Sequence, residues 1–100
     1  ILERNFRARG GEVDIIARDG NDIVFVEVKT RFGDCFGRAS EAVDRVKQQR
    51  LVRAALFYLS RQSFKNENYR FDVVTIEVDR NRETFEDAVI SHYRNAFLIE

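Results

Sequence analysis

Hydrophobic and polar positions alternate along much of this chain in short stretches, and glycines separate these stretches within the first forty residues. Alternation with a period of two, together with β-branched and aromatic residues, predicts β-strands. Asp19-Gly20-Asn21-Asp22 is a strong hairpin turn, because Asp-Gly and Gly-Asn tolerate positive φ angles. The predicted strands span residues 2–8, 12–18, 23–29 and 71–78, with a weaker edge strand at 83–90.

A different spacing follows the loop predicted at residues 30–39. Apolar residues recur there every three or four positions, which predicts a helix from an N-cap at Ser40 to about Gln62. A final helical turn is expected over residues 91–97. The apolar stripe of the long helix comprises Val43, Val46, Leu51, Ala54, Ala55, Phe57, Tyr58 and Leu59.

The expected element order is strand, strand, strand, helix, strand, strand. The third strand is apolar on both faces, which is typical of a central strand covered on both sides. We therefore expect an α/β fold of α+β character, a mixed sheet with flanking helices, in a single domain over residues 1–100.

Two cations lie within the apolar stripe of the predicted helix. At 100° per residue, Lys47 and Arg50 fall near its centre. Either their side chains extend to the surface along apolar neighbours, or the first turns of the helix overlook a wet and acidic site.

The composition excludes some classes of protein. Hydrophobic residues make up 44% of the chain and charged residues 34%, which is too apolar for a disordered segment. No apolar run approaches the roughly 20 residues that span a bilayer, so no membrane association is expected. The one cysteine, Cys35, cannot form an internal disulfide, and a reducing cytoplasm is the expected location. Cys35 with His92 as its base is a conceivable nucleophile, but an inert cysteine is the simpler interpretation.

The net charge is zero but unevenly distributed. Residues 1–70 contain 14 Lys/Arg and 10 Asp/Glu, whereas residues 71–100 contain 3 and 7. If the acids of the first part gather in one site, the surface around them is basic, as in proteins that bind nucleic acids. An ordinary mixed surface would have the same composition.

Candidate chemistry is concentrated on the predicted hairpin. Glu12 and Asp14 alternate on one strand, and Glu27 and Lys29 alternate on the next, so each pair shares a face. A turn centred between residues 20 and 21 places position 14 opposite position 27, and position 12 opposite position 29. We therefore expect three carboxylates and one amine to meet on one patch.

Such a patch needs further positive charge, because clustered carboxylates repel one another. Mg²⁺ prefers hard oxygen ligands and retains several waters, so it would suit this site. A metal-bound water is a better nucleophile, and Lys29 could orient it or stabilise charge on a phosphate. The pattern indicates phosphodiester hydrolysis. A cross-strand charge pair without chemistry is the alternative, since Glu-x-Lys alone is common.

Several segments resemble one bacterial family. Gly11-Glu12-Val13-Asp14-Ile15-Ile16-Ala17 and Phe25-Val26-Glu27-Val28-Lys29-Thr30-Arg31 are similar to the YraN family, as are Arg4-Asn5-Phe6-Arg7, Phe36-Gly37, Arg70-Phe71-Asp72-Val73-Val74 and Asn95-Ala96-Phe97. The resemblance covers nearly the whole chain. It implies a restriction-endonuclease-like fold of the PD-(D/E)xK type, beside archaeal-type Holliday junction resolvases. Family members carry an N-terminal helix ahead of the first strand, so we expect this fold without that helix here.

The resemblance also implies roles for matching residues. Asp14 would be the central metal ligand, with Glu27 and the Val28 carbonyl as further ligands and Lys29 as the catalytic lysine. Glu12 would bind the metal or its water, and Lys47 would be the helix lysine of the family.

The resulting hypothesis is a Mg²⁺- or Mn²⁺-dependent endonuclease acting on DNA, with branched or structured DNA as one candidate substrate. Two cuts in one duplex or junction would require a homodimer. Candidate phosphate contacts are Arg7, Arg31, Lys47 and Arg50. A nucleic-acid-binding module without catalysis, and a protein-interaction module, are the alternatives that the sequence leaves open.

Overall fold

A computed structural model of the chain describes residues 1–32, 43–61, 68–78 and 88–97. Five strands and one helix follow one another in the order predicted from the sequence. The elements are β1 (Glu3–Ala8), β2 (Gly11–Asp19), β3 (Asp22–Phe32), α2 (Arg45–Arg61), β4 (Asn68–Val78) and β5 (Val89–Phe97).

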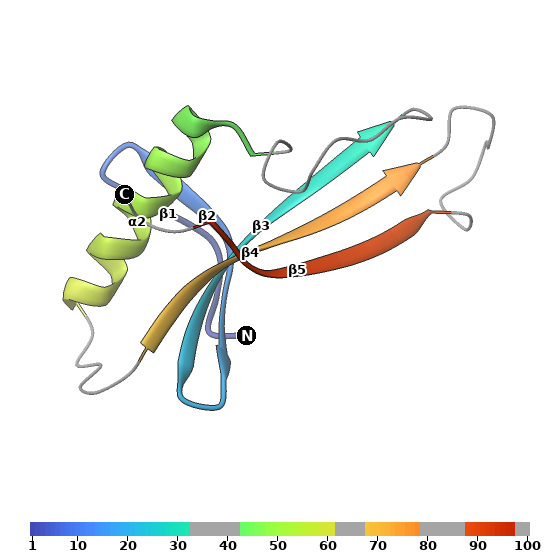
Figure 1. The fold of residues 1–100 in the computed structure, drawn as a ribbon. Coiled ribbons are helices and arrows are strands. Elements are labelled where there is room, and N and C mark those ends of the chain that lie inside the picture. The colour runs from blue at the N-terminus through green and yellow to red at the C-terminus, as the bar shows by residue number, and fades with distance from the viewer. Residues whose placement is uncertain (33–42, 62–67, 79–87, 98–100) are drawn as a thin grey trace.

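All five strands form one sheet in the order β1-β2-β3-β4-β5 (Figure 1). Neighbouring strands are antiparallel except β3 and β4, which are parallel. Parallel strands need a long crossover connection, and the segment that contains α2 provides it. The fold is thus α+β, with a mixed sheet and a flanking helix, as expected from the sequence, and β3 is its central strand.

The helix packs against the end of the sheet formed by β1 and β2 (Figure 1). Four of its residues, Leu51, Ala54, Ala55 and Tyr58, are buried and confirm half of the predicted stripe. Burial of such side chains contributes about 25 cal/mol for each Å² of apolar surface removed from water. The sheet supplies the other half of this core with Val13, Ile16, Ile23, Phe25 and Phe71.

The start of α2 differs from the prediction. Ser40 lies outside the described residues, but the helix begins only at Arg45, with Asp44 as its N-cap. The carboxylate of Asp44 accepts a hydrogen bond from the Lys47 backbone N–H at 2.8 Å, and this bond satisfies a donor that the first turn leaves free. Val46, predicted to be buried, is 65% exposed, so this part of the first turn does not pack against the sheet.

Two further differences concern the strands. β3 continues through Phe32, beyond the loop predicted to begin at residue 30. The helical turn predicted at residues 91–97 is wrong, because this segment is most of β5. Asn95 interrupts the strand with φ of 51°, where the register shifts, and this irregularity disguises the alternation of a strand. Of the edge strand predicted at 83–90, residues 83–87 lie outside the described part, and β5 begins at Val89.

Candidate functional site

The predicted hairpin opens into a fork at its far end. Antiparallel pairing of β2 and β3 runs from Asp19–Asp22 at the turn to Ile15–Val26. Beyond this point β2 remains paired with β1 and turns toward α2, whereas β3 follows β4 in another direction (Figure 1). The register near the turn is the predicted one. The fork exposes backbone groups that would otherwise continue the ladder.

Asp14 lies at the base of this fork and is half-buried. One of its carboxylate oxygens, Oδ2, accepts a hydrogen bond from the Val28 backbone N–H at 2.8 Å. The side chain therefore replaces the strand partner that Val28 lacks on this edge. Because the N–H and C=O of one residue in a strand project to the same edge, the carbonyl of Val28 also faces the fork.

Glu27 is the second carboxylate at the fork and is half-buried. Its pKa rises from 4.5 to about 7, first because burial disfavours the charged form and second because Asp14 is nearby. A side-chain hydrogen bond with Asp14 raises it further, and the charge of Glu12 adds a smaller increase. Two carboxylates that share one site cannot both ionise easily. The pair thus retains a proton near neutral pH.

Lys47 opposes this effect from across the fork. It lies in the first turn of α2, and its charge lowers the pKa of Glu27. This position explains why a lysine falls within the predicted apolar stripe, since that part of the helix overlooks the carboxylates. Lys29 follows Glu27 by two residues on β3, so it shares the same face of the strand and is half-buried.

Glu12 is placed differently from the prediction. It does not lie opposite Lys29, because the β2–β3 ladder ends at Ile15 and Val26. Its neighbour on β1 is Arg7. Oε2 of Glu12 forms an ion pair with Nε of Arg7 at 3.1 Å. Among the residues that the structure describes, no three acidic, histidine or cysteine side chains form a group that could hold a metal ion. The fork itself contributes two carboxylates and a backbone carbonyl.

This donor set fits a hard divalent cation. Mg²⁺ commonly binds through one or two carboxylates and keeps several waters for its remaining positions. Burial and the charge of Asp14 raise the pKa of Glu27 despite the charge of Lys47, and a bound cation would favour the ionised form of both carboxylates. Asp14, Glu27 and the carbonyl of Val28 are the groups that could hold the ion.

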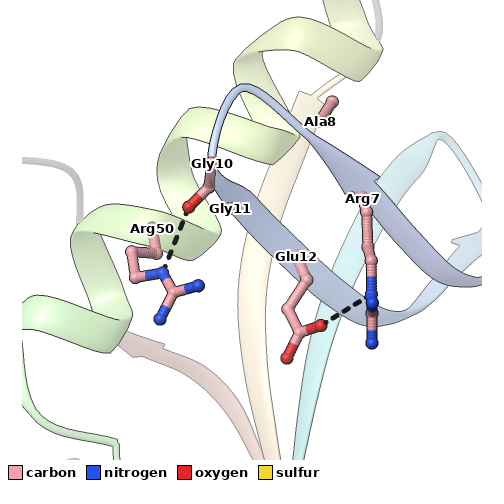
Figure 2. Close-up of a pocket in the computed structure, with 6 residues that line it drawn as sticks. All are labelled: Arg7, Ala8, Gly10, Gly11, Glu12 and Arg50. Carbon is pink, nitrogen blue, oxygen red and sulfur yellow. Dashed lines mark hydrogen bonds and ion pairs between the residues drawn. The ribbon is translucent and has the colours of Figure 1, made fainter.

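The four candidate phosphate contacts occupy different surroundings. Lys47 faces the acidic pair, and Arg7 and Arg50 line one hollow beside the β1–β2 turn (Figure 2). Arg31 lies near the end of β3, where Nη2 donates to Oε1 of Glu77 at 2.8 Å in a largely buried ion pair. The structure thus places Lys47 at the fork, Arg7 and Arg50 at the hollow, and Arg31 in a largely buried ion pair.

A second charged cluster, absent from the sequence-based predictions, lies on β4 and β5. The carboxylate of Asp72 is fully buried and accepts hydrogen bonds from Arg70 Nε at 3.1 Å and from the Asn95 backbone N–H at 2.9 Å. His92 Nε2 lies 2.6 Å from the same carboxylate. The alternation of Arg70 and Asp72 in an apolar strand could have indicated this cluster, because the same spacing drew attention to Glu27 and Lys29.

Arg70 extends the cluster to the hairpin turn. It donates to Asp22 Oδ2 at 2.8 Å and to Asp19 Oδ2 at 3.0 Å. The guanidinium of Arg70 therefore joins β2, β3 and β4, and the Asp72 carboxylate joins β4 to β5. His92, considered above as a base for Cys35, is engaged with Asp72 instead, and Cys35 lies outside the described residues.

Comparison with known proteins agrees with the resemblance found in the sequence. The model of the uncharacterised protein family UPF0102 matches residues 1–76. A UPF0102 protein of Caldicellulosiruptor saccharolyticus is 50% identical over 97% of this chain and 80% of its own length. Similar proteins occur in Caldanaerobacter subterraneus, 45% identical over 97% of this chain and 78% of its own, and in Geobacter metallireducens, 48% identical over 97% and 75%.

Proposed function

Because the chain belongs to the uncharacterised family UPF0102, the YraN family, whose name assigns no activity, we propose a function from the site itself. The proposal is a Mg²⁺- or Mn²⁺-dependent endonuclease that hydrolyses phosphodiester bonds in DNA. The observation that carries it is the pairing of Asp14 with Glu27, whose pKa rises to about 7 in a fork bordered by lysines. Such strongly shifted groups in a partly buried site are typical of functional centres.

Each residue at the fork has a distinct part in this proposal. Asp14 and Glu27 would hold the metal together with the Val28 carbonyl, and the bond from Val28 N–H fixes the Asp14 carboxylate. When bound, the metal supplies an activated water and polarises a phosphoryl oxygen. Lys29, on the same strand face as Glu27, would orient that water or stabilise charge on the phosphate. Lys47 would attract the phosphate to the acidic pair.

Supporting observations extend to the substrate. Lys47 faces the acidic pair, and Arg7 and Arg50 line one hollow together with Glu12, two residues before Asp14. Such cations attract the phosphates of nucleic acids. A preference for branched or structured DNA is part of the proposal and rests on the resemblance to resolvases. Two cuts in one junction would also require two copies of the chain.

Metal binding tests the centre directly. We expect isothermal titration to detect Mn²⁺ and Mg²⁺ binding to the wild-type protein and to detect none with Asp14→Asn. Glu3→Gln is the matched control, since it removes an exposed carboxylate from β1 and should leave metal binding unchanged. Labelled junctions, flaps and duplexes should then be cut in Mn²⁺ by the wild type and by Glu3→Gln only.

A negative result would be equally informative. If neither metal binds the wild-type protein, with or without DNA, the nuclease proposal fails. DNA binding without metal binding would then favour a non-catalytic nucleic-acid-binding module. Binding of neither would favour a protein-interaction module.

Among the described residues, no helix is long and apolar enough to cross a membrane.

A further inference from the structure

An open hollow of about 500 Å³ lies between the β1–β2 turn and α2 (Figure 2). We infer that it is a subsite for a phosphate group of the nucleic-acid backbone, held by Arg7 and Arg50. The inference rests on the proposed function and extends it to how the substrate is held. The lining residues are Arg7, Ala8, Gly10, Gly11, Glu12 and Arg50.

Backbone contact fixes one wall of this hollow. A Cβ atom on Gly11 would lie 1.9 Å from the carbonyl oxygen of Arg50, so only glycine permits this approach of β2 to α2. Nε of Arg50 then donates to the carbonyl of Gly10 at 3.1 Å. That bond uses one of the five guanidinium donors and leaves the two terminal amino groups for other acceptors. A phosphate offers oxygen atoms at the spacing that the planar guanidinium prefers.

On the opposite wall, the guanidinium of Arg7 already pairs with a carboxylate of the protein. Nε of Arg7 pairs with Glu12 at 3.1 Å, and the two side chains are 79% and 51% exposed. An exposed ion pair of this kind contributes only about 0–1 kcal/mol, so a competing anion can replace it readily. Two arginines face one carboxylate in the hollow, and this excess of positive charge favours a phosphate.

Position links the hollow to the acidic pair. Glu12 lines the hollow and lies two residues before Asp14 on β2, so the two side chains share one face of that strand. The hollow and the fork are thus neighbours on the same end of β2. A phosphate held by Arg7 would compete with Glu12 for that arginine. The phosphate in the hollow would therefore be one that lies next to, and not at, the bond to be cut.

Salt dependence of DNA binding tests this subsite. Anisotropy of labelled single-stranded and duplex DNA would be measured without divalent metal over a range of salt concentrations. The slope of log K against log salt is negative. We expect Arg7→Ala and Arg50→Ala each to reduce its magnitude by about 0.7 on single strands and by about 0.9 on duplex. The matched controls are Arg4→Ala on β1 and Arg53→Ala on α2, which remove exposed arginines outside the hollow.

A conservative variant separates binding from folding. Arg50→Lys keeps the charge but not the planar guanidinium, so it should retain the wild-type slope while Arg50→Ala does not. Inorganic phosphate alone should bind the wild type and Arg7→Ala equally weakly in an isothermal titration. If the wild type binds phosphate and Arg7→Ala does not, while the two variants leave the DNA slopes unchanged, the hollow binds free phosphate and the inference is overturned.

The failure of the subsite can be told from that of the proposed function. If DNA binds, metal binding at Asp14 is intact, and the slopes for Arg7→Ala and Arg50→Ala equal those of the controls, only the subsite is wrong. Failure of the wild type to bind any DNA at low salt overturns both.

Discussion

Two buried or half-buried carboxylates on neighbouring strands, Glu27 and Asp72, have opposite surroundings. Burial and the neighbouring Asp14 raise the pKa of Glu27 to about 7. Burial acts on Asp72 in the same direction, but hydrogen bonds from Asn95, His92 and Arg70 outweigh it, and the pKa of Asp72 is lowered from its ordinary value of 3.8. Burial alone therefore does not decide how a carboxylate behaves, and the donors around it do.

The difference separates a structural role from a functional one. Every group that Asp72 needs is supplied by the protein, so its charge stabilises the fold. Glu27 instead neighbours a second carboxylate, Asp14, and among the described residues the charge of Lys47 offsets this only in part. Strongly shifted groups of this kind are typical of functional sites, which is why our proposal places the metal at Glu27 and not at Asp72.

The largest expected effect comes from breaking the satisfied cluster. Arg70→Ala leaves Asp72 buried without its guanidinium, which should destabilise the protein by about 3–5 kcal/mol, the usual cost of an orphaned buried charge. Chemical denaturation at pH 7 would measure this loss. Since the stabilisation by Asp72 is present above its ordinary pKa and lost as the pH falls through its lowered pKa, the variant should also lose less stability than the wild type on acidification.

A smaller effect of opposite sign is expected at the strained pair. Glu27→Gln removes the repulsion with Asp14 and should stabilise the metal-free protein at pH 8 by about 1–2 kcal/mol, after screening of a half-buried group is allowed for. A group with a raised pKa stabilises the folded state at low pH and loses this contribution as the pH rises. Stability of the wild type in a chelator should therefore fall between pH 4.5 and about 7, and the variant should lack this decline.

Metal binding should follow the same titration. Protons and Mn²⁺ compete for Glu27, so the affinity of the wild type for Mn²⁺ should increase as the pH rises through about 7. An affinity that is the same on both sides of this pH would show that Glu27 is not a ligand.

The smallest effect is expected from His92→Ala. The ring is half exposed, and its removal leaves Asp72 with its bonds from Arg70 and Asn95. We expect a loss of about 1 kcal/mol, the net value of a typical hydrogen bond. A loss as large as that of Arg70→Ala would mean that the histidine compensates the buried charge as much as the arginine does.

Sequence patterns predicted the architecture well where local rules govern it. The Asp-Gly turn set the register of β2 and β3, and the alternation of Glu27 with Lys29 placed them on one face. The family was also predicted correctly, because the motifs that carry it lie in these strands.

The failures arose where tertiary contacts override local pattern. The fork between β2 and β3 separates Glu12 from Lys29, and no residue between positions 11 and 29 predicts this separation. Similarly, the irregularity at Asn95 depends on the carboxylate of Asp72, which is 23 positions away. Contacts of this range leave no trace in a period of two or 3.6 residues.

The parallel pairing of β3 with β4 has a consequence for how the chain folds. Its partners are 46 positions apart, as Arg31 and Glu77 are, whereas β2 and β3 are joined by a two-residue turn. Non-local pairing slows folding, while a hairpin forms in about 1–10 μs. During synthesis Asp14 and Glu27 are therefore free to meet before α2 and Lys47 exist to offset their charge. Until the helix forms, the repulsion between these two carboxylates is not offset by Lys47.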